Sequence, residues 1–174
     1  MAHTHSVHDT DARFTINPIT RAIKNESSRK TSLVQHDHNS ERFSFELPRY
    51  IEGHDMMQCN QVQVHFINIS ATKEQKSGVY TVDDLQEATD GENTVVCSWL
   101  ISHNATSLVG KLNFLLRFCC IEGGVVVYSW NTAVYSGVTI SDGINADESF
   151  EAEYVDIIEK WKADAVHDIT AEVN

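Results

Sequence analysis

The hydrophobic period of this chain changes near Asp142, and that change constrains the fold more than any other feature of the sequence. Before Asp142, apolar residues recur at every second position, which is typical of β-strands with one buried and one exposed face. After Gly143 they recur at every third or fourth position, which predicts an amphipathic α-helix. We therefore expect a β-rich body followed by one helix.

The body is predicted to be a series of short strands separated by polar turns. Segments 42–48 and 61–66 alternate apolar and polar residues, and Pro48 ends the first of them. The segments 68–78 and 102–110 interrupt the alternation, as a polar hairpin tip and as a long turn or single helical turn. Without long helices between the strands, an all-β antiparallel β-sandwich over residues 13–142 is expected, Ig-like or jelly-roll-like. Further predicted strands are 14–16, 19–24, 32–35, 79–82, 95–101, 111–121 and 125–135.

The hairpin around Gly123 and Gly124 allows a prediction of register. A two-residue turn would place Phe118 opposite Ser129 and mix the core and solvent faces, whereas a three-residue loop keeps apolar residues together. We predict the three-residue loop, with a glycine in the left-handed position of a G1 bulge. The predicted pairs are Cys120 with Val126, Phe118 with Tyr128, Leu116 with Trp130, Phe114 with Thr132 and Leu112 with Val134.

The charge of the chain is unevenly distributed. Its formal net charge is −12, of which residues 147–174 contribute −7 through nine acidic and two basic residues. Residues 13–50 are mildly basic at +3, from seven Lys or Arg against four Asp or Glu. We do not expect nucleic-acid binding, because phosphate contacts need a concentrated basic surface and this acidic chain has none.

The composition indicates a packed domain made in a cytoplasm. Hydrophobic residues make up 41% of the chain, with only 2 Pro and 8 Gly, so a real core is expected. There is no apolar signal sequence and no segment of about 18 apolar residues that could be inserted in a membrane. The four cysteines show no CxxC spacing, so we predict neither a disulfide framework nor a metal framework, and no cofactor. Neighbouring Cys119 and Cys120 should point to opposite faces of a strand.

Two terminal segments are predicted to lie outside the body. Residues 1–12 lack apolar periodicity and are expected to be a flexible leader; a solvated tail is favoured over a weak metal site at its histidines. Residues 143–174 are predicted to form an acidic amphipathic helix that serves for oligomerisation or as a connector. Pairing with copies of itself is favoured over packing onto the body, although Asp164 and Asp168 interrupt a strict heptad. Its apolar stripe is Phe150, Tyr154, Ile157, Ile158, Trp161, Ala165 and Ile169.

Candidate chemical sites are weak. His36 and His38, with His54 on a later loop, could be ligands of a metal-dependent hydrolase, but a turn capped by Asp37 or Asn39 explains the same pattern better. No nucleophile elbow, phosphate-binding loop or HExxH motif is present, so no catalytic residue is predicted. Three tryptophans could be sugar-stacking platforms, but Trp99 and Trp130 fall on apolar strand faces, where core positions are favoured, and Trp161 belongs to the helix stripe.

Five segments in order along the chain resemble one known family. They are ERFSFELPRYIEGHDM at 41–56, VYTVDDLQ at 79–86, SWLISHNAT at 98–106, GKLNFLLRF at 110–118 and YSWNTAVYSG at 128–137. Together they are similar to the N-terminal domain of phage baseplate upper proteins, which occurs in tail and receptor-binding proteins of phages and prophages of Gram-positive bacteria. The resemblance covers about residues 13–142.

The resemblance implies a structural protein of the virion and no enzyme. It implies a β-sandwich that attaches a peripheral tail component to other baseplate and tail proteins, typically as a homotrimer, with a helix leading to receptor-binding parts. Because the sequence ends at Asn174, a short accessory protein and a fragment of a longer one are both open. The alternative from another class is a carbohydrate-binding β-sandwich that contacts the host surface, and the metal-dependent hydrolase is a remote third.

Overall fold

A computed structural model describes residues 12–27, 31–89 and 93–143 of the 174-residue chain. Residues 1–11 of the predicted leader and residues 144–174 of the predicted helix lie outside the described residues. The apolar stripe from Phe150 to Ile169 therefore stays a prediction.

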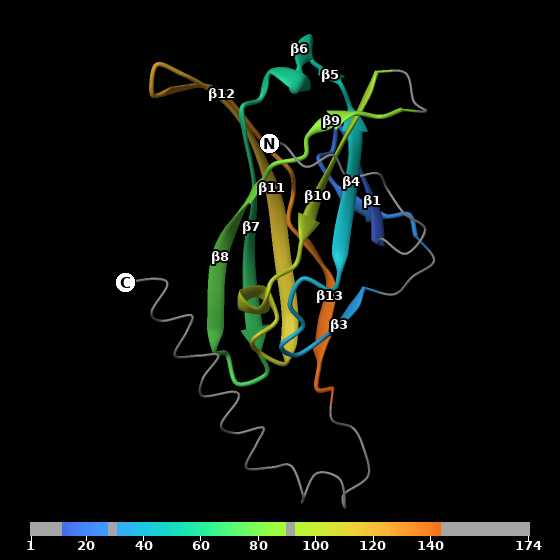
Figure 1. Ribbon diagram of the computed structural model, residues 1–174, viewed down its shortest axis with the longest axis vertical. Coiled ribbons are helices and arrows are strands. Elements are labelled where there is room, and N and C mark those ends of the chain that lie inside the picture. Colours follow the sequence, from blue (N-terminus) through green and yellow to red (C-terminus); the bar gives the residue numbers. More distant parts are fainter. Residues whose placement is uncertain (1–11, 28–30, 90–92, 144–174) are drawn as a thin grey trace, which may run out of the picture.

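The described residues form thirteen strands and two short 3-10 helices (Figure 1). The strands are β1 (Ala12–Ile16), β2 (Ile23–Asn25), β3 (Ser32–Val34), β4 (Arg42–Pro48), β5 (Tyr50–Ile51), β6 (His54–Asp55), β7 (Gln61–Ser70), β8 (Gln75–Val82), β9 (Gln86–Glu87), β10 (Thr94–Leu100), β11 (Gly110–Glu122), β12 (Val125–Asn131) and β13 (Tyr135–Ser141). The 3-10 helices are η1 (Met56–Gln58) and η2 (His103–Ala105). The second of them lies in the segment where one helical turn or a long turn was predicted.

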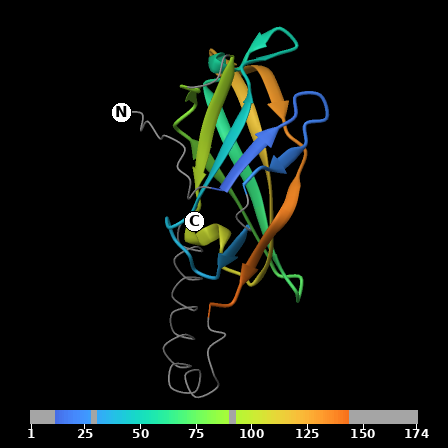
Figure 2. The same ribbon diagram turned by 90° about the vertical axis from the view of Figure 1, so that its right-hand side faces the viewer.

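Two mixed sheets build the body and together form a half-barrel, an arrangement that is compatible with the predicted sandwich. One has the strand order β2-β1-β4-β10-β9, and the other has the order β3-β13-β11-β7-β8 with β12 paired to β11. Figure 2 shows their strands running along the long axis of the molecule. The small β5-β6 hairpin follows the end of β4.

The core between the sheets is centred on aromatic rings. Phe114 of β11 lies 5.3 Å from Trp99 and 5.7 Å from Phe45, measured between ring centroids, and both partners belong to the other sheet. Phe14 reaches Phe114 at 6.0 Å in an edge-on arrangement. These inward positions are the apolar ones of the strand alternation, so the period of two in the sequence identified the buried faces. Trp99 and Trp130 are buried, as predicted.

The prediction of a purely antiparallel sandwich is wrong at two places. β1 pairs with β4 in parallel, and β13 pairs with β3 in parallel. Between β1 and β4 the chain passes through β3, which belongs to the other sheet, so it can return in the same direction as it left. A parallel pair needs such a long connection, and strand alternation alone carries no information about it.

The predicted register of the β11–β12 hairpin is also wrong. Glu122 pairs with Val125, so the turn contains two residues, and Phe118 lies opposite Trp130 instead of Tyr128. Gly123 and Gly124 have φ angles of 57° and 77°, as a type I′ turn requires. A register shift beyond Cys120 returns the apolar residues to the same face, which the two-residue alternative without a bulge could not do.

Several strand boundaries differ from the predictions. The segment predicted as one strand over 125–135 is divided, because Thr132 leaves the ladder and bonds Leu116 through both its amide and its hydroxyl. β12 consequently pairs with the second half of β11, and β13 pairs with the first half. Most of the predicted polar tip over 68–78 is paired in β7 and β8. Strand β2 begins at Ile23, after a turn capped by the Asn17 side chain.

Candidate interaction surface and a cysteine-histidine cluster

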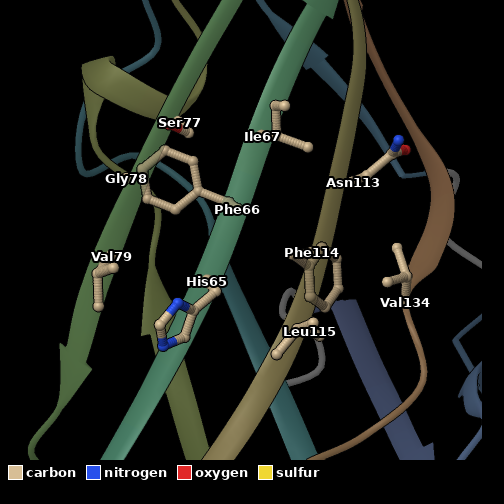
Figure 3. A pocket seen from close by; sticks show the side chains of 10 residues that line it. All are labelled: His65, Phe66, Ile67, Ser77, Gly78, Val79, Asn113, Phe114, Leu115 and Val134. Atoms are coloured by element: carbon tan, nitrogen blue, oxygen red, sulfur yellow. The ribbon is translucent and has the colours of Figure 1, made fainter.

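A shallow groove of about 360 Å³ lies on the outer face of the six-stranded sheet (Figure 3). Its floor contains a row of cross-strand neighbours, Val79 of β8, His65 of β7 and Leu115 of β11. Val134, 58% exposed, adds an apolar side chain at the other edge. Contact between water and such apolar side chains is unfavourable, so covering this face with another surface lowers the free energy of the system.

His65 does not make the groove charged. Burial lowers the pKa of its imidazole, and the nearby positive charge of Arg117 lowers it further. Its Nε2 lies 3.1 Å from the Gln63 side-chain oxygen. The groove therefore presents a neutral, mostly apolar surface at neutral pH.

The tip of the β11–β12 hairpin is a second exposed apolar feature. Val125, Val126 and Val127 are 62%, 48% and 55% exposed. Successive strand residues point to opposite faces, so exposure of three in a row means that neither face of the tip is covered. Val126 was predicted to lie on the core face with Cys120, and that prediction is wrong because Ile121 is its partner.

Polar residues from three of the five family-like segments meet in one buried network. Arg42 Nη1 donates to Ser98 Oγ at 2.7 Å, and the Ser98 amide donates to Asp84 Oδ1 at 2.8 Å. The Ser98 hydroxyl also donates to Asp84 Oδ2, and Arg42 Nη1 lies 3.9 Å from that oxygen. Asp84 and Ser98 are buried, so the network ties the segment after β8 to β10 and β4.

A second polar group organises the β5–β6 end of the molecule. Arg49 binds the Asp55 carboxylate with two nitrogens at 2.9 and 3.0 Å, and also contacts Glu87. Asp55 in turn accepts from the Met57 amide and caps η1. The hydrogen bonds from Arg49 are the main cause that lowers the pKa of Asp55 below its usual value.

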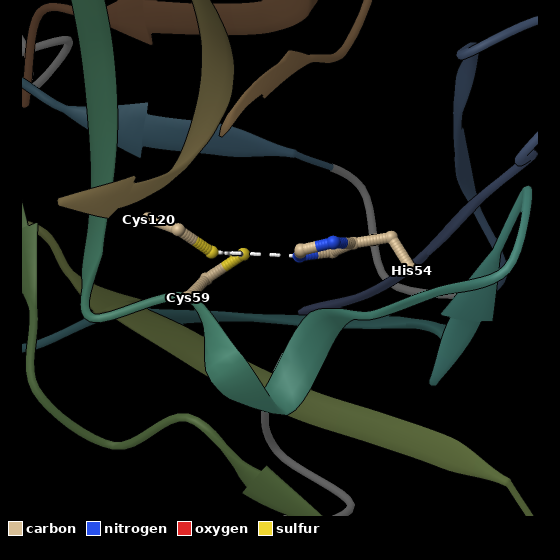
Figure 4. Close-up of side chains that lie close together, drawn as sticks. All are labelled: His54, Cys59 and Cys120. Carbon is tan, nitrogen blue, oxygen red and sulfur yellow. Dashed lines mark hydrogen bonds between the residues drawn. The ribbon is translucent and has the colours of Figure 1, made fainter. Parts of the chain in front are cut away.

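Next to this end lies a cluster of one histidine and two cysteines (Figure 4). Cys120 Sγ is 3.4 Å from His54 Nε2 and 3.7 Å from Cys59 Sγ. Burial is the main cause that raises the pKa of the Cys59 thiol to about 12. The cluster was missed at the sequence level, because Cys59 and Cys120 are 61 positions apart and only the β7–β11 pairing brings them together.

The structure does not bring His36, His38 and His54 together as a hydrolase site would require. The His38 and His103 Nδ1 atoms are 3.1 Å apart, in a contact beside η2. His54 lies beyond the opposite end of β4, with the cysteines. The alternative prediction of a capped turn is confirmed at Asp37, whose carboxylate accepts from the Val34 amide at 3.0 Å.

The remaining candidate residues from the sequence, the tryptophans and the adjacent cysteines, contribute to packing inside the domain. Trp99 stacks on Phe66 at 5.5 Å and Trp130 lies 6.0 Å from Phe118, so these two rings are core and not exposed sugar platforms. Cys119 and Cys120 point to different neighbours, as predicted: Cys119 contacts the Ser129 hydroxyl. The groove could have been suspected from Leu115, an apolar residue at an outward position of its strand.

Comparison with solved structures gives a similar chain, the N-terminal domain of phage TP901-1 ORF48. The TM-score is 0.46 at 18% sequence identity, and the match covers 76% of this chain and 98% of that one. No family model and no curated protein matches the sequence. Among the described residues, no helix is both long enough and apolar enough to cross a membrane.

Proposed function

We propose that this protein is a structural component of a phage or prophage tail, in which the β-sandwich attaches a peripheral or receptor-binding component to the baseplate. The observation that carries the proposal is the place of the five family-like segments in the fold. They contain all of β4, most of β11, half of β8 and parts of β10, β12 and β13, and so include the central strand of each sheet. The resemblance thus extends over the framework of the domain.

The polar residues in those segments support the same role. Arg42, Asp84 and Ser98 bond one another, and Arg49 and Asp55 form a bidentate ion pair that caps η1. Each of these groups fixes one chain segment to another. An attachment domain needs such rigidity, because a preformed surface loses less conformational entropy on binding.

The apolar groove over β8, β7 and β11 is the surface we assign to the contact with another tail protein. Its exposed valines and neutral histidine suit an apolar partner surface. The contact is tested with Val79→Asp, which places a charge in the groove. Thr81→Asp is the matched control, since Thr81 is also exposed and outward on β8 but lies outside the groove.

The test uses purified virions, or particles from an induced prophage, and mass spectrometry of their proteins. We expect the chain among the tail proteins, co-purification with an identified baseplate protein, and loss of that co-purification in Val79→Asp but not in Thr81→Asp. Absence of the chain from intact particles would overturn the proposed function. If Val79→Asp and Thr81→Asp co-purify equally with the baseplate protein, the groove is not the contact surface, although the proposed tail function would stand.

The homo-oligomer remains part of the proposal through the predicted helix. Residues Phe150, Tyr154, Ile158 and Trp161 would cover one another between copies, because an isolated amphipathic helix is marginal in water. Light scattering after size exclusion should give a trimer or another oligomer for the full chain. The double variant Ile158→Glu/Trp161→Glu should be monomeric, whereas the control Lys160→Glu, which lies off the apolar stripe, should keep the oligomer. A full chain that stays monomeric at high concentration would contradict the proposed homo-oligomer.

A further inference from the structure

Three chain segments bring sulfur and nitrogen atoms to one point at the end of the sandwich. His54 comes from β6, Cys59 follows η1 directly, and Cys120 lies near the end of β11. The Asp55 cap on η1 sets the path from His54 to Cys59. The pairing of Gln61 with Cys119 then brings the start of β7 beside the end of β11.

Two of the three distances between these atoms fit the edges of a metal coordination tetrahedron. With Zn–S bonds of about 2.3 Å and Zn–N bonds of about 2.0 Å, two sulfurs lie about 3.8 Å apart and a sulfur and a nitrogen about 3.5 Å apart. The corresponding distances here are 3.7 Å between the sulfurs of Cys59 and Cys120, and 3.4 Å from Cys120 Sγ to His54 Nε2. All three ligand atoms lie within 4.8 Å of one another.

We propose that His54, Cys59 and Cys120 bind one Zn²⁺ ion. Two thiolates and an imidazole are a donor set that suits zinc, and carboxylates, which suit magnesium or calcium, are absent from this group of three. Binding converts the two thiols to thiolates and releases their protons to solvent. Three protein ligands leave the fourth position to water, which can enter from the side of the half-buried His54.

The surroundings hold the histidine ready for this role. The Tyr128 ring stacks on the His54 ring with centroids 3.6 Å apart and planes 15° apart, which restricts rotation of the imidazole. In this orientation the His54 ring points toward the two sulfurs (Figure 4). The bidentate contact with Arg49 holds the neighbouring Asp55 in place. A ligand fixed in this way loses little freedom when the metal binds.

Zinc bound here would link the β5–β6 hairpin to β11, the strand that leads into the β11–β12 hairpin. The two cysteines are 61 positions apart, so the metal closes a long loop and stabilises the folded state relative to the unfolded chain. The expected consequence is a melting temperature that rises with Zn²⁺ and falls with a chelator.

The test uses the full chain, purified with a reductant and loaded with Zn²⁺ or Co²⁺. We expect one Zn²⁺ per chain by native mass spectrometry. Co²⁺ should give intense visible bands of tetrahedral geometry and a near-ultraviolet thiolate-to-cobalt band. That band also separates this site from His3, His5 and His8, which carry no sulfur. Cobalt bound without a thiolate band would overturn the proposal.

Single substitutions identify the ligands. Cys59→Ser, Cys120→Ser and His54→Gln should each lower Zn²⁺ affinity by at least about a hundredfold, more than loss of an outer hydrogen-bond partner costs. Cys119→Ser is the matched control, because it changes the adjacent buried cysteine, which contacts Ser129 instead. Equal losses in Cys119→Ser would overturn the assignment.

Two further measurements keep the result decisive. If either cysteine variant fails to fold, the cobalt spectra of the wild type and of His54→Gln decide, since His54 is only half-buried. Alkylation of protein prepared without reductant tests the competing chemistry of these thiols. A Cys59–Cys120 disulfide in the protein prepared without reductant, together with no metal uptake after reduction, would overturn the zinc site.

Discussion

The ring of Phe66 occupies the space in which a side chain on Gly78 would begin: a β-carbon built on Gly78 would lie 2.5 Å from Phe66 Cζ. The two residues are direct cross-strand partners in β7 and β8. Phe66 is buried and stacks on Trp99 at 5.5 Å, so its ring has little space to move away. The glycine is therefore part of the packing between the sheets.

We expect Gly78→Ala to destabilise the domain by about 1–3 kcal/mol, the usual cost of forcing extra volume into a packed core. The urea midpoint of unfolding should fall accordingly. Ser77→Ala is the control, because Ser77 is exposed on the same strand and points outward. An unchanged midpoint for Gly78→Ala would show that the Phe66 ring can yield.

Local alternation in the sequence was enough to identify the strands that form the core. Phe45, Phe114 and Trp99 all lie at inward positions of segments with a clear period of two, and all three are buried. The period reports which face of a strand is apolar, and burial of that face is what folds the chain. For that reason a mostly-β fold with one apolar face on each core strand could be predicted without any knowledge of pairing.

Features that depend on distant contacts could not be obtained in this way. Nothing local indicates that β1 lies parallel to β4, or that the chain leaves the ladder at Thr132 to bond Leu116. The His54 cluster is the clearest case, because its cysteines lack any ligand spacing and meet only through strand pairing. Spacing rules detect sites built on one element, and this site is built on three.

Asp84 lies between β8 and β9 and accepts hydrogen bonds from Ser98 of the five-stranded sheet, and we expect its loss to destabilise the domain more than loss of any neighbouring polar residue. Asp84→Ala leaves the Ser98 amide and hydroxyl without their acceptor, and unpaired buried groups cost about 1–3 kcal/mol. Thermal or urea unfolding measures the loss. Asp83→Ala changes the exposed neighbour and should stay within about 0.5 kcal/mol of the wild type.

A double-mutant cycle tests whether the network, and not the single carboxylate, causes that loss. Asp84→Ala and Ser98→Ala share hydrogen bonds, so their effects should be less than additive. Additive effects would mean that the two residues act independently.

Acid should weaken the β5–β6 end through Asp55. Its pKa in the folded protein is lowered from 3.8, first by the hydrogen bonds of Arg49. A group with a depressed folded pKa contributes stability above its unfolded pKa, and that contribution is lost as pH falls through the folded value. The stability difference between wild type and Asp55→Asn should thus be constant from pH 5 upward and shrink below about pH 4. Urea midpoints across this range measure it, and a difference independent of pH would contradict the ion pair.

The two-residue turn of the β11–β12 hairpin requires a left-handed backbone at both of its central residues. Gly123 and Gly124 both have left-handed φ angles, and a β-carbon on either would meet nothing within 4 Å, so only backbone conformation opposes a side chain there. Asn tolerates this region and is common at the first position of such turns, so Gly123→Asn should leave stability unchanged. Gly124→Val should cost about 1–2 kcal/mol, because a β-branched residue resists left-handed backbone. The urea midpoints of unfolding of both variants measure these effects, and NMR contacts between the protons of Phe118 and Trp130 check that the register is unchanged. A Gly124→Val variant as stable as the wild type would contradict the two-residue turn and favour a longer loop.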